Sequence, residues 1–407
     1  MKKLVFAAGY ATVINFVLTG SAFAQQTPST EELWQMLQDQ QQEIAALKQQ
    51  LEQNNTQIQQ TQVMAISVAD AIENQSANST TPSWADKTTI GGYGEHHYNA
   101  VDGGRDQVDA HRYVLYVSHD YSDSVRFFSE WELEHSLAGD GKPGEVELEQ
   151  AYIEWQFNPN HRATFGQYLV PVGLLNETHE PDTFYGVERN KVEAEVVPST
   201  WWETGAMLSG NLAQGLSYNL AIHSGLNLSD EAGSIESFRI RSGRQKSAKA
   251  NANNFAYTGR LSYTGTPGLA MSISVQHQTD LLQNMVVDED APATLVEAHL
   301  AYQVKNFSLR ALYAAWDIDN ASFEANDSDN PSGWYVEPSY KLSDKLGVFA
   351  RYSEVDPRRG DRPTQVTEQV DFGFNYWLTP QVAIKADYQD SQQDGDDAIN
   401  IGIGWSY

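Results

Sequence analysis

Apolar and polar side chains alternate strictly along the end of the chain, from Asp397 to Tyr407. Isoleucine and aromatic residues occupy the odd positions from 399 onward, and asparagine, glycine and serine occupy the even positions. The same period-two alternation recurs in runs of about ten residues back to Ile90, which is typical of strands in a transmembrane β-barrel. In such a barrel the last strand must pair with the first, because hydrocarbon tolerates no unpaired sheet edge.

Sixteen strand-like runs follow Thr88. Their connections alternate between tight turns and longer polar loops, which predicts an outer-membrane barrel with its short turns in the periplasm. A soluble all-β protein is the alternative, but it should show a hydrophobic core rather than two-faced strands. The runs lie near 90–99, 111–121, 124–135, 145–157, 161–167, 203–211, 215–224, 255–264, 268–279, 294–304, 306–316, 333–342, 345–355, 366–378, 381–390 and 397–407.

One face of the predicted strands carries charged residues of both signs. Alternation turns the apolar side chains outward to lipid and the charged side chains inward, and sixteen strands enclose a water-filled channel. The run near 145–157 changes face midway, so it either contains a β-bulge or has a different boundary. The residues predicted for the pore wall are Arg126, Glu130, Glu132, Glu297, His299, Arg310, Glu337, Arg351, Lys385 and Asp387.

The connection from Tyr168 to Trp202 departs from this pattern because it is long and rich in apolar residues. An external loop of this composition would expose a large hydrophobic patch. Folding into the lumen would bury the apolar residues against the wall and present the charged residues to the channel. The predicted pore constriction comprises Glu177, His179, Glu180, Asp182, Glu188, Arg189, Lys191 and Glu193.

The amino-terminal part of the chain predicts three further segments. Residues 1–24 combine a basic start, an apolar middle and a small-residue end, which are the features of a cleaved secretory signal peptide. Residues 25–73 contain a heptad repeat that predicts a periplasmic coiled coil, and residues 74–87 form a polar linker. The expected fold is therefore all-β, a 16-stranded antiparallel transmembrane β-barrel at 88–407 that is preceded by an α-helical coiled coil.

The chain contains 54 acidic and 26 basic residues and no cysteine. The excess of acid argues against a nucleic-acid partner, because phosphate contacts need clustered lysine and arginine. The sequence has no serine-hydrolase elbow, no nucleotide-binding loop and no zinc-protease motif. We therefore expect no catalytic residue, no cofactor and no metal.

Three groups of charged residues leave alternatives open. His96 and His97 could bind a metal, but adjacent strand residues face opposite sides, so a pore-facing and a membrane-interface histidine are expected. The acidic loop segments at 288–290, 327–329 and 394–397 either bind Ca²⁺ or Mg²⁺ loosely or are simply solvated. The basic cluster at 239–249 either attracts anionic solutes to the mouth or pairs with acidic loops or lipid phosphates.

Several motifs around the long connection resemble the phosphate-selective porin family and its siderophore-porin relatives. The resemblance implies a sixteen-stranded, usually trimeric outer-membrane channel that is narrowed by its third loop. This chain departs from the phosphate-selective members because its inward arginines, Arg126, Arg260, Arg310 and Arg351, are interleaved with acids. The motifs are Phe165-Gly-Gln, Pro171-Val-Gly, Asn176-Glu, Phe184-Tyr-Gly-Val-Glu-Arg-Asn190, Pro198 and Trp201-Trp-Glu-Thr-Gly205.

The sequence thus predicts a porin of a Gram-negative outer membrane that passively conducts small hydrophilic solutes and ions, with a weak cation preference. A channel dedicated to a siderophore or to phosphate is the first alternative. A barrel enzyme and a structural tether with a plugged barrel are the other two. Expected partners are outer-membrane lipid and lipopolysaccharide, two further copies of the chain in a homotrimer, and peptidoglycan or a periplasmic protein bound by the coiled coil.

Overall fold

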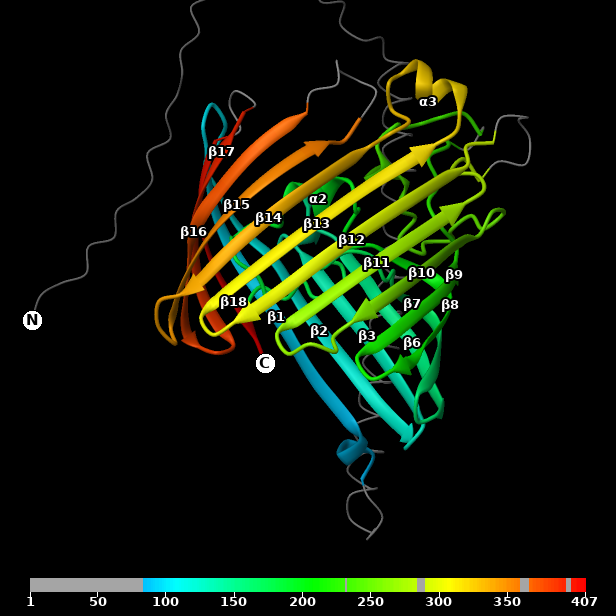
Figure 1. Cartoon of the computed structure of the whole chain (residues 1–407), viewed down its shortest axis with the longest axis horizontal. Helices are drawn as coiled ribbons and strands as arrows, with labels where there is room; N and C mark the ends of the chain where they lie inside the picture. Colours follow the sequence, from blue (N-terminus) through cyan, green and yellow to red (C-terminus); the bar gives the residue numbers. More distant parts are fainter. Residues whose placement is uncertain (1–82, 231–232, 284–289, 359–365, 393–396) are drawn as a thin grey trace, which may run out of the picture. The chain divides into compact units, whose positions relative to one another are not determined.

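The computed structural model describes residues 83–230, 233–283, 290–358, 366–392 and 397–407. Sixteen strands in these ranges form one closed antiparallel barrel, as predicted (Figure 1). Two further strands of two residues each, β4 and β5, pair with each other outside it. The elements are η1 (Trp84–Lys87), β1 (Thr88–Val101), β2 (Gln107–Ser122), β3 (Val125–Glu134), β4 (Ala138–Gly139), β5 (Lys142–Pro143), β6 (Val146–Asn158), β7 (His161–Leu169), α2 (Lys191–Glu195), β8 (Trp202–Ala213), β9 (Leu216–His223), η2 (Ile240–Gly243), β10 (Ala256–Tyr263), β11 (Leu269–Gln278), β12 (Ala293–Val304), β13 (Phe307–Ile318), α3 (Ala321–Ala325), β14 (Ser332–Lys341), β15 (Leu346–Asp356), β16 (Thr367–Thr379), β17 (Val382–Ser391) and β18 (Ala398–Ser406).

The predicted signal peptide, the coiled coil and most of the linker lie outside the described residues, so they stay predictions. Among the residues that are described, none of the helices has both the length and the apolar character needed to cross a membrane.

The first and last strands close the barrel. Gly94 of β1 pairs with Trp405 of β18, and the backbone of Tyr407 extends this pairing through two hydrogen bonds with Gly92, of 2.9 and 3.1 Å. A Cβ atom on Gly94 would lie 2.7 Å from the Trp405 ring, so glycine is required where the aromatic side chain crosses the seam. The pairing leaves neither strand with an open edge, as the alternation at the end of the chain predicted.

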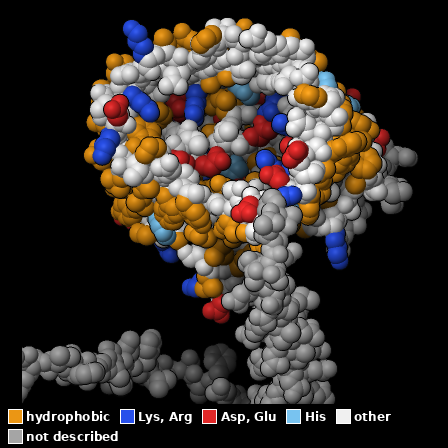
Figure 2. Space-filling view, turned by 90° about the horizontal axis from the view of Figure 1, so that it is seen from below, with side chains coloured by type: hydrophobic (Ala, Val, Ile, Leu, Met, Phe, Trp, Pro, Cys, Tyr) orange, Lys and Arg blue, Asp and Glu red, His pale blue; other side chains and the backbone are white. Residues whose placement is uncertain are grey.

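The outer face of the barrel is apolar and the inner face is polar. On β18 the side chains of Ile399 and Ile401 are about half exposed, whereas Asn400 between them is buried inside the barrel. Viewed from the end that carries the short turns, the barrel has hydrophobic side chains around its outside and acidic and basic side chains within its hollow (Figure 2). This is the two-faced arrangement that a lipid-embedded barrel needs.

Two β-bulges change which side chains face the lumen. In β6, Gln150 pairs with Glu130 and Leu148 pairs with Trp131, so Glu149 is an extra residue. This bulge explains the change of face that the sequence pattern showed in this strand. In β2, one extra residue lies between Asp109 and Arg112 relative to the partner strand β1. An extra residue turns neighbouring side chains toward the same face, so each bulge adds a polar side chain to the lumen.

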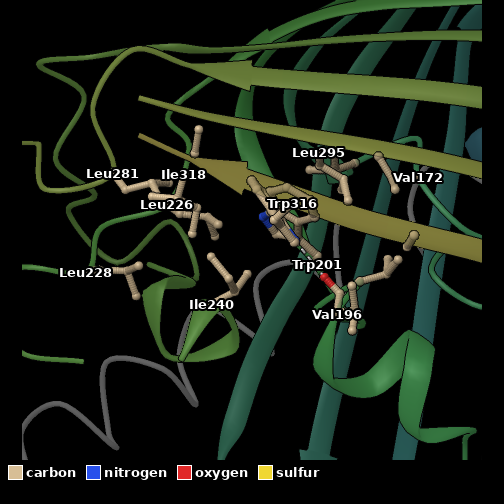
Figure 3. Packing of buried hydrophobic residues seen from close by; sticks show 14 of the residues in the cluster. Val172, Val196, Trp201, Leu226, Leu228, Ile240, Leu281, Leu295, Trp316 and Ile318 are labelled. Carbon is tan, nitrogen blue, oxygen red and sulfur yellow. Dashed lines mark hydrogen bonds between the residues drawn. The ribbon is translucent and has the colours of Figure 1, made fainter. Parts of the chain in front are cut away.

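A hydrophobic cluster lies inside the barrel near its long-loop end (Figure 3). It joins the connection 170–201 and the connection 224–255 to the inner faces of β12–β14. Val196 and Trp201 are fully buried, and the indole Nε1 of Trp316 donates a 2.9 Å hydrogen bond to the carbonyl of Val196. Both connections therefore fold into the lumen, although the sequence analysis assigned the second one to the outside.

An arginine on the lipid-facing side of β18 should destabilise the barrel. We expect Ile401→Arg to lower the free energy of unfolding by about 2–4 kcal/mol, because a cation would lie in hydrocarbon. Urea titration of the lipid-reconstituted protein, followed by tryptophan fluorescence, measures the effect. Gln156→Arg is the matched control, because Gln156 is exposed on the lumen face of β6 and its free energy of unfolding should hardly change. Equal losses in both variants would contradict the assigned faces.

Candidate functional site

The segment 170–201 crosses the lumen and is held to the wall through its backbone. On one side, the ammonium of Lys385 donates to the carbonyl of Gly186 at 2.9 Å. The carboxylate of Asp387 accepts a 2.6 Å hydrogen bond from the amide of Val187. Both contacts are made to backbone groups of the segment. These wall residues therefore fix the path of its backbone and do not fix the positions of its side chains.

Several wall residues that were predicted to line an open pore instead lie behind this segment or in buried pairs. Arg351 is buried between Glu337 and Asp371, at 3.0 and 2.8 Å. Glu297 is fully buried and contacts His299 at 2.7 Å. These residues face the inside of the barrel, and three of the predicted wall residues, Arg310, Lys385 and Asp387, form hydrogen bonds with the backbone of the segment. Arg310 donates to the carbonyl of Thr183 at 2.8 Å, and Arg126 pairs with Asp120 at 2.7 Å.

Glu193 is the inner support of the segment. Its carboxylate is fully buried and accepts hydrogen bonds from the amides of Leu174 and Leu175 and, at 2.7 Å, from the hydroxyl of Tyr335 on β14. Asn190 begins α2 by accepting from the amide of Glu193 at 2.9 Å. The prediction that Glu193 faces the channel is therefore corrected, because its acceptors are used within the fold.

Two cavities lie on the β1–β10 side of the segment. The vestibule cavity has a volume of about 360 Å³ and reaches toward the long loops, and the periplasmic cavity has a volume of about 390 Å³ and reaches toward the short turns. They share no lining residue. The vestibule cavity is lined by Glu95, His97, His111, Glu134, His135, Glu147, Phe184, Val187, Glu188, Arg189, Ala194, Ser199, Thr200, Trp202, Arg241, Arg244 and Lys246. The periplasmic cavity is lined by Tyr93, Tyr116, Phe128, Glu130, Gln150, Tyr152, Glu154, Arg162, Thr164, Tyr168, Leu169, Glu177, His179, Glu180, Met207, Asn219 and Arg260.

A layer of buried charged side chains separates the two cavities. Arg112 contacts Glu95 at 2.5 Å and donates to the carbonyl of His179 at 2.6 Å. The ring of His179 lies 3.5 Å from Glu149, the bulge residue of β6. We call Arg112, Glu132, Glu149 and His179 the constriction layer.

Several buried polar atoms of the constriction layer form no hydrogen bond with the described residues. Arg112 Nη1, Glu132 Oε1, both carboxylate oxygens of Glu149 and His179 Nε2 are buried and have no hydrogen-bond partner in the described part of the protein. Buried polar atoms in folded proteins are normally hydrogen-bonded. Such a group of atoms is suited to contact water and solutes that pass between the cavities.

The surroundings of the segment shift the pKa values of two of its residues, His179 and Glu188. Burial, and then repulsion by Arg189 and Arg112, lowers the pKa of His179 from 6.5 to about 4. Burial opposes ionisation of Glu188, but its 2.9 Å hydrogen bond with His97 outweighs this and lowers the pKa of Glu188 to about 2. At neutral pH His179 is therefore neutral and Glu188 is charged.

The other predicted constriction residues are divided between the two sides of the layer. Glu177 and Glu180 line the periplasmic cavity, where Glu177 pairs with Arg260, and Arg189 lines the vestibule cavity. Asp182 accepts a 2.8 Å hydrogen bond from Ser406. Lys191 begins α2 and lines neither cavity.

Sequence reasoning missed Arg112, Glu149 and the inward course of the connection 224–255, although it named the basic cluster at 239–249 as a possible attractor of anions. Glu149 depends on the β-bulge of β6, which period-two counting does not place, whereas Arg112 follows the regular alternation with the outward Tyr113 and Leu115 and could have been found by counting. The third left a signal, because Leu226, Leu228 and Ile240 make that connection apolar and all three are buried in the lumen.

The closed sixteen-stranded barrel, its apolar outer face and its inward segment define the class of outer-membrane porin channels. Residues 92–398 match the family described as phosphate-selective porin O and P, and the chain belongs to this family. An uncharacterized protein of Aquifex aeolicus is 28% identical over 353 residues, which cover 78% of this chain and 80% of that protein.

Two solved structures have a similar fold at low sequence identity. The outer membrane channel DcaP of Acinetobacter baumannii has a TM-score of 0.55 and 12% identity, over 79% of this chain and 97% of that one. The anion-selective porin from Comamonas acidovorans has a TM-score of 0.54 and 11% identity, over 79% and 99%.

Removal of the Glu193 carboxylate should release the segment from the wall. Glu193→Ala leaves two backbone amides and the Tyr335 hydroxyl without their acceptor, and each such loss costs about 1–3 kcal/mol. We expect a larger and noisier single-channel conductance in planar bilayers, and faster proteolysis within 170–201. Glu180→Ala is the control, because this half-buried acid of the same segment has no such contacts. An unchanged conductance in Glu193→Ala would show that the segment does not depend on this carboxylate.

Acidification should weaken the docking of the segment. A released His179 has its ordinary pKa near 6.5, whereas the docked residue has a pKa of about 4. The released state therefore binds the proton first as the pH falls from 6.5 to 4, and docking loses stability across this window. We expect the conductance of the wild-type channel to rise in this window and that of His179→Gln to change less. The same pH response in both would exclude His179 as its cause.

Proposed function

We propose that the protein is a passive diffusion channel for small hydrophilic solutes, with a vestibule that concentrates small anions. The proposed path runs from the vestibule cavity through the constriction layer to the periplasmic cavity. Three guanidinium groups in the vestibule support the preference for anions.

Arg189, Arg241 and Arg244 have no carboxylate partner among the described residues. Arg189 donates to the hydroxyl of Thr200 at 2.9 Å, and Arg241 donates to the carbonyl of Ala194 at 2.9 Å. Arg244 donates to the carbonyl of Thr200. Each group is therefore positioned by neutral oxygens. Nearby acids, such as Glu195 for Arg241 and Glu147 for Arg244, attract these groups but form no direct ion pair with them in the described part of the chain.

The three guanidinium groups repel one another, and this repulsion favours binding of an anion between them. Burial, and then the charges of Arg244 and Arg189, lower the pKa of Arg241 to about 9, although Glu195 opposes this shift. An anion in the vestibule cavity would relieve this repulsion, and guanidinium groups bind carboxylates and phosphates well. The family's description and the anion-selective porin of similar fold agree with this proposal.

The weak cation preference expected from the sequence is the second candidate. It is favoured by the carboxyl groups of Glu132 and Glu149 in the constriction layer, because Glu132 Oε1 and both oxygens of Glu149 accept no hydrogen bond from the described residues. A negative ring at the narrowest point excludes anions and admits cations. The two candidates differ in which charge group dominates, so one measurement separates them.

The zero-current potential across a bilayer with a tenfold salt gradient tests the proposal. We expect the wild-type channel to prefer anions, and this preference should fall at high salt because the Debye length shrinks to about 3 Å at 1 M. Replacing Arg189, Arg241 and Arg244 by glutamine should abolish the preference while conserving hydrogen-bond donors.

Arg239→Gln is the matched control on the same connection, because Arg239 is already paired with Glu195 at 2.7 and 3.0 Å. A cation preference in the wild type that is lost in a Glu132→Gln, Glu149→Gln double variant would replace the proposal by its second candidate. A folded protein without conductance would favour the plugged tether. The homotrimer, the lipopolysaccharide contact and the partner of the coiled coil remain proposals.

A further inference from the structure

One carboxylate oxygen at the wall of the vestibule is shared by two histidines. Asp109 Oδ2 lies 3.2 Å from His111 Nδ1 and 2.7 Å from His135 Nδ1. Each of the three side chains offers one ligand atom, and these atoms all lie within 4.8 Å of one another. Two ring nitrogens and one oxygen thus converge on a small volume.

The fold builds this group from strand β2 and the loop that follows β3. Asp109 and His111 flank the β-bulge of β2, which turns them toward the lumen. His135 follows the end of β3, and its amide donates a 3.1 Å hydrogen bond to the carbonyl of His111. The backbone contact fixes the separation of the two imidazoles, so the group does not depend on flexible side chains alone.

A third histidine stands beside the group but is already occupied. The ring of His97 stacks on that of His111 at 4.4 Å between centroids. Its two nitrogens contact Glu95 at 3.0 Å and Glu188 at 2.9 Å. His97 therefore positions His111, whereas His111 and His135 contact carboxylate only through Asp109.

We propose that Asp109, His111 and His135 form a binding site for one transition-metal ion such as Zn²⁺. A tetrahedral ion with bonds of about 2.0 Å separates its ligand atoms by about 3.3 Å, close to the spacings of Asp109 from both rings. Two imidazole nitrogens favour Zn²⁺, Cu²⁺ or Ni²⁺ over Ca²⁺ and Mg²⁺, which prefer oxygen ligands. Because His111 and His135 line the vestibule cavity, an ion can enter from it and keep one open position toward it.

The site is independent of the anion preference proposed above. It uses the β2–β3 wall, whereas the guanidinium groups belong to the inward connections. The proposal differs from the expectation of no metal site, which rested on the absence of a zinc-protease motif, on the acidic loops and on the adjacent pair His96 and His97. That pair behaves as predicted, because His97 faces the lumen and His96 lies outside against Trp405.

Metal titration of the full-length barrel in detergent tests the site. The protein is prepared without a histidine tag, because a tag would itself bind the metal. All ten histidines of the chain lie among the described residues. After treatment with a chelator, calorimetry with ZnCl₂ should give one ion per chain. The visible absorption of Co²⁺ should show the intense bands of tetrahedral coordination. In His135→Gln and in His111→Gln, which each remove a direct ligand, the affinity should fall at least by the factor of about 10 to 100 that loss of an outer-shell partner causes.

Two further variants keep the result interpretable. His299→Gln is the matched control, because His299 also contacts a lumen carboxylate at 2.7 Å but belongs to no such group. His179→Gln tests one competing group, Glu130, Glu149 and His179. Another, His97, His111 and Glu188, shares His111 with the proposed site but is left intact by His135→Gln. Heat-modifiable migration on denaturing gels verifies that each variant assembles.

The proposal is overturned if the assembled wild type binds no Zn²⁺, or if His179→Gln, and not His135→Gln, loses the ion. Equal loss in His299→Gln would likewise overturn it, because the binding would then be nonspecific.

Discussion

Hydrocarbon offers no hydrogen-bond partner to a backbone amide, so every strand in the membrane must pair on both edges. The pairing of β1 with β18 meets this requirement by closing the barrel. Everything else in the structure depends on it. Closure fixes one face of each strand toward lipid and the other toward the lumen, so the charged residues of the strands collect inside. A sheet of sixteen strands closes around a space that is too wide for its own side chains to fill.

The segment 170–201 and the connection 224–255 occupy much of that space. Their apolar residues pack with Trp316 and its neighbours on β12–β14, and buried acceptors such as Glu193 fix their backbone. Buried charged residues of β17 have the same effect, because Asp387 and Lys385 form hydrogen bonds with backbone groups of the segment. The two cavities lie on the β1–β10 side, where acids of the wall and guanidinium groups of the loops together line the vestibule cavity.

The β-bulges in β6 and β2 determine which of the polar side chains in these strands face the lumen. In β6 the bulge adds Glu149 to the constriction layer, and in β2 it adds His111 to the vestibule wall. A regular strand would place only alternate residues in the lumen. In both strands the residues with the most unusual environment lie where the regular pattern is interrupted, as is common near functional sites.

The sequence alone determined the class of fold, the sixteen strands and their approximate limits, because period-two alternation is a local property that each strand carries by itself. It also indicated the inward segment, since an apolar connection such as that around Val196 has nowhere else to be buried. Only the tertiary structure decided which charged residues line the passage. Glu193 and Glu180 look alike in sequence, yet one is enclosed by donors and the other faces a cavity. The physical reason is that the environment of a lumen side chain depends on groups tens to hundreds of residues away, such as Tyr335 for Glu193, and no local pattern encodes those contacts.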